Sequence, residues 1–86
     1  MTQKISEPVS VKMVFDHQLG KAKPEQILWH NKIYPVTQVG LRHIVRDGRK
    51  LYHIFSLVSH ATFLRLSLDT EKLSWTLEEV SDGISN

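Results

Sequence analysis

The sequence predicts an all-β protein, a six-stranded antiparallel meander that forms a small β-barrel of the Src-homology type. Three observations lead to this prediction. Apolar and polar residues alternate along several short segments, as they do in half-buried strands. Turn-forming residues separate these segments at intervals of roughly 8–12 residues, as in small barrels. Helical periodicity does not persist over any stretch of about 10–12 residues, the length that an ordinary helix needs.

The central element is a predicted hairpin over residues 41–58. Asp47 and Gly48 lie between the apolar runs Leu41–Val45 and Leu51–Val58. A two-residue type I′ turn requires positive φ at both central positions, which Gly adopts freely and Asp tolerates. A turn centred on these two residues places Ile44 opposite Leu51 and His43 opposite Tyr52.

The N-terminal half contains three further expected strands. Residues 1–8 read as a loose terminus, and residues 17–24 as a polar loop. A tight turn is expected at Asn31-Lys32, because Asn accepts a left-handed conformation. The third strand is long, with Pro35 at an edge and a bulge near Gly40, where the alternation changes face. The expected strands are Val9–Asp16, Gln26–His30 and Ile33–Val45.

The C-terminal half contains the last two expected strands, Ala61–Asp69 and Leu73–Val80, joined by a polar turn over residues 69–72. Pairing across this turn places three apolar pairs on one face, which supports the register. The predicted pairs are Leu68 with Leu73, Leu66 with Trp75, and Leu64 with Leu77.

The chain has 86 residues, which suffice for one small domain with one modest core. We expect a single domain, 1–86, that is ordered over about 9–81 and flexible at both ends. The expected core residues are Val11, Met13, Phe15, Ile27, Trp29, Leu51, Phe55, Leu57, Leu64, Leu66, Leu68, Trp75 and Leu77.

Composition excludes several classes of protein. There is no cysteine, so neither disulfides nor a Cys-based zinc site can supplement the core. No apolar run approaches the roughly 18 residues of a spanning helix, and no signal-peptide pattern is present. We therefore expect a cytoplasmic protein that does not enter a membrane. The net charge is +2, but residues up to His60 carry nine Lys or Arg against four acids, which could mark a basic face.

Several residues resemble the pattern of a known family. They follow P-x-x-apolar-x-W, Y-x-V and W-x-L…V-x-D spacings over roughly Val9–Asp82, nearly the whole chain. The pattern is similar to that of a family of small uncharacterised bacterial proteins, a domain of unknown function. Some members lie beside or are fused to Y-family DNA polymerases. The resemblance implies a fold and an association with DNA metabolism, and it brings no catalytic residues. The matching residues are Pro24, Ile27, Leu28, Trp29, Lys32, Tyr34, Val36, Val39, Tyr52, His53, Ile54, Leu66, Asp69, Trp75, Thr76, Leu77, Val80 and Asp82.

Catalytic and metal-binding constellations are not evident in the sequence. The five histidines are too scattered for a zinc site, and only His43 and His53 could meet, on the central hairpin. Glu78 and Glu79 are adjacent on a strand, so they point to opposite faces and cannot act as an acid/base pair. No glycine-rich phosphate loop or nucleophile motif is present. We expect a protein that is not an enzyme and uses neither metal nor cofactor.

Binding is therefore the expected function, with two kinds of partner left open. Small barrels bind single-stranded nucleic acid with a basic groove and stacking aromatics. The candidate residues for a nucleic-acid or partner surface are Arg42, Arg46, Arg49, Lys50, Tyr52, Lys32 and Tyr34. The first expectation is instead a protein-binding or accessory module that accepts a partner at a sheet edge, with the chain itself a monomer or weak homodimer. Phe63 and Ile54 are expected to form an exposed apolar patch.

Overall fold

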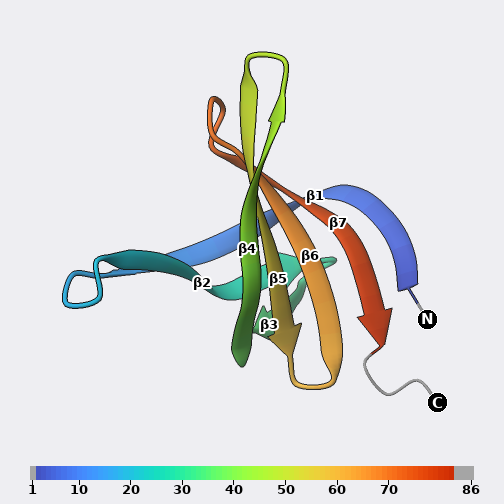
Figure 1. The fold of residues 1–86 in the computed structure, drawn as a ribbon. Helices are drawn as coiled ribbons and strands as arrows, with labels where there is room; N and C mark the ends of the chain where they lie inside the picture. The colour runs from blue at the N-terminus through green and yellow to red at the C-terminus, as the bar shows by residue number, and fades with distance from the viewer. Residues whose placement is uncertain (1, 83–86) are drawn as a thin grey trace.

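The computed structural model describes residues 2–82, which form one antiparallel ladder of seven strands in the order β3-β2-β1-β7-β6-β5-β4 (Figure 1). The all-β class is confirmed. The strands are β1 (Thr2–Asp16), β2 (Lys21–Trp29), β3 (Lys32–Pro35), β4 (Gln38–Asp47), β5 (Lys50–Ser59), β6 (Thr62–Asp69) and β7 (Ser74–Asp82).

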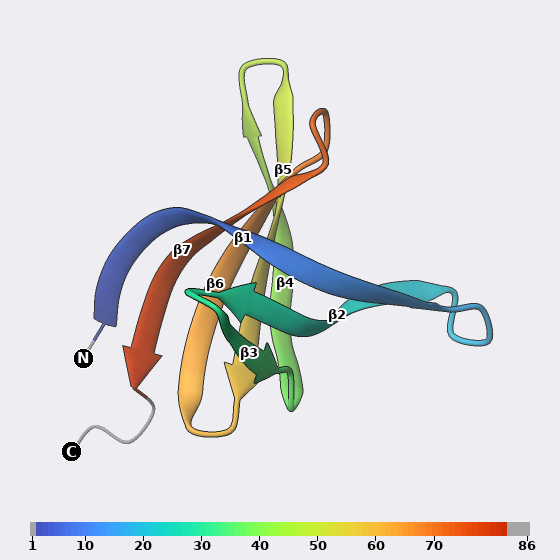
Figure 2. The same cartoon turned by 180° about the vertical axis from the view of Figure 1, so that it is seen from behind.

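Strand β1 belongs to two sheets, and this division creates the two layers of the fold. Its first half, Thr2–Val9, pairs with β7, and its second half, Ser10–Asp16, pairs with β2. A register shift between Lys4 and Glu7 bends the first half, and Ser6 within it has a φ of 54°. The second half therefore crosses behind β4–β7, and the end of the β1–β2 hairpin projects beyond them (Figures 1 and 2). We call this projecting end, residues 13–24, the arm.

The core lies between the two layers. Its fully buried apolar side chains are Ile27, Phe55, Leu57, Leu64, Leu66 and Leu77, and eight half-buried side chains, including Trp29 and Trp75, pack around them. The predicted core is therefore largely confirmed. Met13 and Phe15 are corrections, because 36% and 65% of their surfaces are exposed. They lie on the arm, and alternation alone could not show that the arm extends past the opposite sheet.

The central hairpin is present, but its turn is shifted by one residue. Asp47 lies opposite Lys50, so Gly48 and Arg49 are the central residues. Gly48 has a φ of 63°, whereas Arg49 has no positive φ, which matches a type II′ turn rather than type I′. Ile44 therefore lies opposite His53, and not opposite Leu51 as predicted. Because both turns have two central residues, the shift keeps each side chain on its predicted face.

The β6–β7 turn is displaced in the same way. Asp69 lies opposite Ser74, so the turn covers residues 70–73 and Leu73 is part of it. The Asp69 carboxylate accepts the backbone N–H groups of Glu71 and Lys72 at 2.9 and 3.2 Å, which starts the turn at Asp69. The observed apolar pairs are Leu68 with Trp75 and Leu66 with Leu77, and a register shift follows at Arg65.

The predicted third strand is two strands, which raises the count from six to seven. β3 ends at Pro35 and β4 begins at Gln38. Between them, the N–H and hydroxyl of Thr37 donate to the Val58 carbonyl at 2.8 and 3.0 Å, which anchors the corner. The predicted bulge near Gly40 is confirmed as a register shift between Val39 and Arg42. A Cβ on Gly40 would lie 3.2 Å from the Ser56 carbonyl oxygen, so glycine permits the close approach there.

The sheet is not closed into the predicted barrel. Within residues 2–82, β3 and β4 are the two ends of the ladder and do not pair with each other. They are successive segments joined at the Thr37 corner, and the last contact with β2 before that corner is the Val36 N–H, which donates to the Glu25 carbonyl at 2.9 Å. The linkage between the two ends of the sheet is therefore covalent, and β4 keeps a free edge.

Both predicted loops at the N-terminal end are shorter than expected. Residues 2–8 are not a loose terminus, because they pair with β7. The β1–β2 loop covers only residues 17–20, and Pro24 is buried within β2 beside a register shift. The β2–β3 turn is at His30-Asn31, both with positive φ, one residue earlier than predicted. The expected flexible end beyond Asp82 lies outside the described residues.

Replacing Leu66, which is completely buried between β5 and β7, tests the core. Leu66→Ala should lower the free energy of unfolding by about 2–5 kcal/mol, because it removes buried methyl groups and leaves a cavity. Leu73→Ala is the control, since Leu73 is 72% exposed in a turn, and its change should stay within about 0.5 kcal/mol. Urea denaturation measures both. Equal effects of the two substitutions would contradict the core assignment.

Candidate functional site

Strand β4 forms an exposed edge of the sheet. All ten residues of Gln38–Asp47 are exposed, and within residues 2–82 the strand pairs only with β5. Exposed apolar side chains lie along it, with exposed fractions that range from 38% for Val39 to 81% for Leu41. A long edge strand with apolar side chains is a template for pairing with another chain. Its exposed apolar residues are Val39, Leu41, Ile44 and Val45.

The register identifies which backbone groups of β4 are unpaired. In a two-residue hairpin the closing pair, here Asp47 and Lys50, is hydrogen-bonded, and bonded and non-bonded pairs then alternate. The N–H and C=O groups of Arg42, Ile44 and Arg46 consequently point away from β5. This assignment agrees with β6, because the carbonyl of Leu51, the partner of Arg46, accepts the N–H of Thr70 at 3.2 Å. The free edge of β4 thus presents three donors and three acceptors.

The side chains of Arg42, Ile44 and Arg46 lie on the same face as the core residue Phe55. Arg42 lies directly opposite Phe55, and its guanidinium is 5.2 Å from the centre of the Phe55 ring. The Arg42 guanidinium is also 3.2 Å from His53 Nδ1. The guanidinium is thereby held over the apolar floor at the base of the hairpin.

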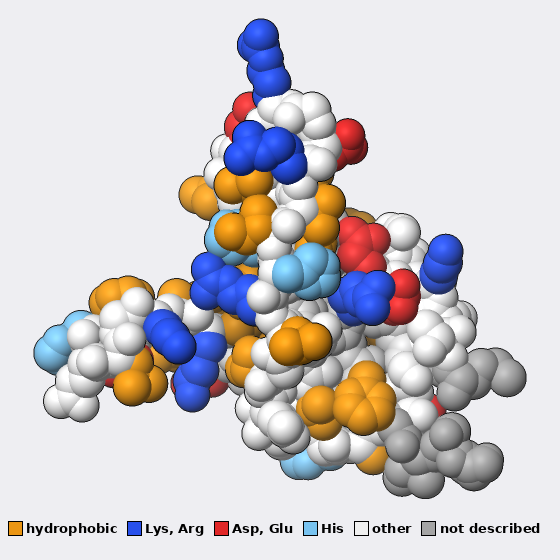
Figure 3. Space-filling model, in the orientation of Figure 1, with side chains coloured by type: hydrophobic (Ala, Val, Ile, Leu, Met, Phe, Trp, Pro, Cys, Tyr) orange, Lys and Arg blue, Asp and Glu red, His pale blue; other side chains and the backbone are white. Residues whose placement is uncertain are grey.

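A groove of about 330 Å³ separates β4 from the arm. Its lining includes the apolar residues Leu19, Ala22, Val39 and Phe55 and three bases, Lys21 and Lys23 on β2 and Arg42 on β4. Figure 3 shows Lys and Arg side chains on the arm, beside β4 and at the tip of the β4–β5 hairpin. The full lining is Asp16, Leu19, Lys21, Ala22, Lys23, Val39, Gly40, Arg42 and Phe55.

The groove and the hairpin are more basic than the rest of the protein. Their bases outnumber their acids by six to two, a net charge of +4, whereas the whole chain has +2. The surroundings of β4 therefore favour an anionic partner. The bases are Lys21, Lys23, Arg42, Arg46, Arg49 and Lys50, and the acids are Asp16 and Asp47.

The structure does not bring the predicted site residues together on one surface. Arg42 and Arg46 point to the core face of the hairpin, and Arg49 is in its turn. By the same pairing, Lys50 and Tyr52 point to the opposite face, where they line a shallow depression together with β6 and β7 residues. The half-buried Tyr52 lies on the opposite face from Arg42 and Arg46, so its ring cannot stack on a nucleobase that these arginines hold.

Lys32 and Tyr34 lie on β3, which belongs to the other layer and does not pair with β4 within the described residues. The Lys32 ammonium lies 5.1 Å from the centre of the Tyr34 ring. Tyr34 is half-buried and packs against the core, with its ring 5.9 Å from that of Trp29. This pair belongs to the support of the β2–β3 turn. The exposed Phe63 is on β6, while its expected neighbour Ile54 is half-buried.

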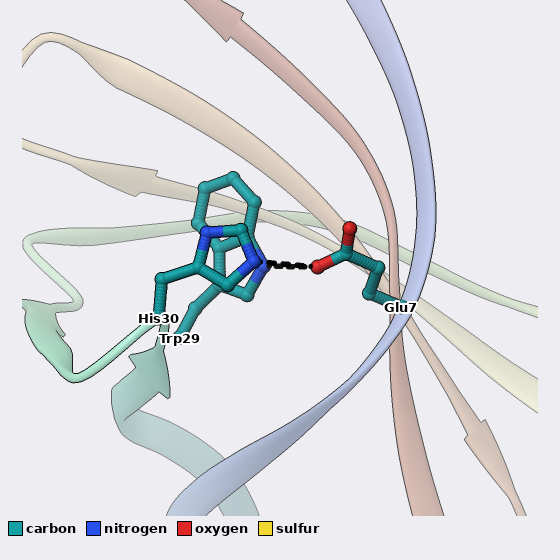
Figure 4. A network of polar contacts seen from close by, with 3 residues as sticks. All are labelled: Glu7, Trp29 and His30. Atoms are coloured by element: carbon teal, nitrogen blue, oxygen red, sulfur yellow. Dashed lines mark hydrogen bonds and ion pairs between the residues drawn. The ribbon is translucent and has the colours of Figure 1, made fainter.

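A second polar cluster, which the sequence did not indicate, joins β1 to the β2–β3 turn (Figure 4). The Glu7 carboxylate accepts the indole N–H of Trp29 at 2.9 Å and lies 2.8 Å from His30 Nε2. The two rings are stacked with their centres 4.4 Å apart. The hydrogen bond from Trp29, and then that from His30, lower the pKa of Glu7 below its ordinary value of 4.5.

This cluster holds the two layers together and offers little chemistry. It contains one carboxylate and one imidazole, and within residues 2–82 no group of three His, Asp or Glu side chains could hold a metal ion. His43 and His53 point to opposite faces of the hairpin, because their pairing partners are Ile54 and Ile44. The cluster was missed because Glu7 lies in the segment expected to be a loose terminus.

Comparison with known proteins adds no relative. No protein-family model matches the chain, and no curated protein or solved structure matches it. None of the described residues belongs to a helix that could cross a membrane.

The Glu7 cluster should make stability depend on pH in the acidic range. Because the pKa of Glu7 is lowered in the folded protein, its contribution to stability is complete above pH 4.5, the ordinary value, and is lost as pH falls through the lowered value. Glu7→Gln should therefore destabilise the protein at neutral pH, and its difference from the wild type should shrink under acid.

Thermal melts of both proteins between neutral and acidic pH measure this difference. The control is Glu71→Gln, which removes the same charge from an exposed turn position. A constant difference between Glu7→Gln and wild type across the acidic range would refute the role given to this carboxylate.

Proposed function

We propose that this chain is a non-catalytic binding module that accepts an extended segment of a partner protein along the free edge of β4. One observation carries the proposal: a ten-residue edge strand is exposed along its whole length, with apolar side chains and a groove beside it. Strand addition supplies main-chain hydrogen bonds for affinity and alternate side-chain positions for specificity. The unpaired groups of Arg42, Ile44 and Arg46 are suited to it.

The added strand also relates the open sheet to the barrel that the sequence predicts. A segment beside β4 would extend the sheet toward the arm, which projects past β4 on the side of its free edge (Figure 2). The side chains on its inner face would enter the groove above Phe55, Val39 and Ala22. In this proposal the chain is a cytoplasmic monomer, and the strand supplied by its partner completes the barrel.

Single-stranded nucleic acid is the second candidate. The net charge of +4 around the groove and hairpin favours it, as does the resemblance to a family associated with DNA metabolism. The position of the aromatics favours the peptide instead. Tyr52 and Tyr34 lie on other surfaces, and Phe55 is only 3% exposed beneath Arg42. The Lys and Arg side chains therefore have no exposed aromatic ring beside them on which a nucleobase could stack.

A proline at position 44 tests strand addition directly. The Ile44 N–H points away from β5, so Ile44→Pro removes an outer donor and obstructs the edge while leaving the β4–β5 ladder intact. Ile44→Thr is the matched control, because it changes the side chain and keeps the N–H. Circular dichroism should show both variants folded.

Selection from a random peptide library displayed on phage provides the measurement. Peptides enriched on the wild type should bind Ile44→Thr and lose at least about tenfold in affinity for Ile44→Pro, since they lose main-chain hydrogen bonds. Equal binding to Ile44→Pro, or no enrichment on the wild type, would exclude β4 as the binding edge.

Fluorescence anisotropy with a labelled oligothymidine tests the second candidate. A single-strand binder that uses these bases should lose affinity steeply between low and moderate salt, because binding releases counterions. Arg46→Ala and Arg49→Ala should weaken such binding with the fold intact. An oligonucleotide that does not bind even at low salt would remove this candidate.

A further inference from the structure

The inward-facing arginines of β4 restrict which strand the edge can accept. Arg42 and Arg46 lie on the core face on either side of Ile44, and all three are exposed. Charged side chains that point inward from an edge strand, like bulges, are devices that prevent unwanted pairing. The register shift between Val39 and Arg42 is a second such device on the same strand. The edge is therefore closed to most strands and open to one with matching charge.

A second copy of this chain does not match. In an antiparallel pair of two β4 strands centred on Ile44, each Arg42 would lie opposite an Arg46. Like charges directly opposite on one face are destabilising. Charge thus disfavours self-association through β4.

An acidic strand does match. Residues directly opposite in a ladder share a face, so partner residues opposite Arg42, Ile44 and Arg46 would all face the arm. Carboxylates at the two outer positions would meet the guanidinium groups, and an apolar residue at the middle position would meet Ile44. Lys21 and Lys23, on the groove rim, favour the same sign of charge.

We infer that the partner segment of β4 is an extended acidic stretch with the pattern acid-x-apolar-x-acid, its carboxylates facing the arm. This inference rests on the proposed strand addition and adds the chemistry of the partner to it. The pattern is symmetric, so it holds for a parallel or an antiparallel partner.

Three capped nine-residue peptides test the pattern. The first contains Glu-Thr-Ile-Thr-Glu. The second contains Lys-Thr-Ile-Thr-Lys and reverses the charge. The third contains Thr-Glu-Ile-Glu-Thr. It keeps the charge and the composition, but its carboxylates lie on the face of the strand opposite to the Ile side chain. Amide hydrogen exchange by NMR reports where each peptide binds, and titration reports its affinity.

The first peptide should slow exchange of the Arg42, Ile44 and Arg46 amides, and the other two should bind at least about tenfold more weakly, because two opposed ion pairs are lost or reversed. Arg46→Glu should remove most of the preference between the first and second peptides, because each would then face one opposite and one like charge. Lys4→Glu, which makes the same charge change on exposed β1, should leave the preference unchanged.

The other outcomes separate the inference from the proposed function. Equal binding of all three peptides with protection of the β4 amides would overturn the acidic pattern and leave strand addition standing. No protection of these amides by any peptide would overturn both. Protection in the free protein that grows with concentration would identify a second copy as the partner. Displacement of the first peptide by oligothymidine at the same salt would assign the basic face to nucleic acid. Either result contradicts the inference.

Discussion

The division of β1 between two sheets is the constraint on which the fold depends. One half of the strand completes the sheet of β7, β6, β5 and β4, and the other half begins the sheet of β2 and β3. Because the single strand β1 belongs to both sheets, the two layers are held face to face and bury Ile27 against Leu66 and Leu77. The contact of Glu7 with Trp29 and His30 joins the layers a second time, close to the bend in β1.

The same constraint leaves the molecule with an edge. The second half of β1 crosses behind β4 and does not pair with it, while β3 leaves the other sheet through the Thr37 corner. β4 thus ends the ladder with a groove beside it, and its arginines limit what can pair there. Exposure of apolar residues and protection by charge coexist on one strand. Such a combination is expected of an edge that must reject most chains and accept a specific one.

Sequence reasoning located the elements well and their partners less well. Alternation found the strands, and glycine and aspartate found the turns, because both depend on residues close in sequence. Three turns were displaced by one residue, at His30, at Gly48 and at Leu73, since several neighbouring residues could occupy the left-handed positions. The candidate site was predicted only in part: Arg42 and Arg46 lie together at the edge, but Tyr52, Lys32 and Tyr34 do not join them. The faces on which these residues lie depend on register and strand order, which cannot be predicted from the presence of Lys, Arg or Tyr at a position.

By itself, the sequence determined the all-β class, the positions of most strands and the six buried side chains of the apolar core, because a period of two is imposed locally by the geometry of extended backbone. Only the tertiary structure decided that β1 belongs to two sheets, that the chain turns a corner at Thr37, and that one edge of β4 is free within residues 2–82. These features arise from contacts between residues distant in sequence. Met13 and Phe15 show the difference most clearly, since their alternation is that of core residues and only the position of the arm exposes them to solvent.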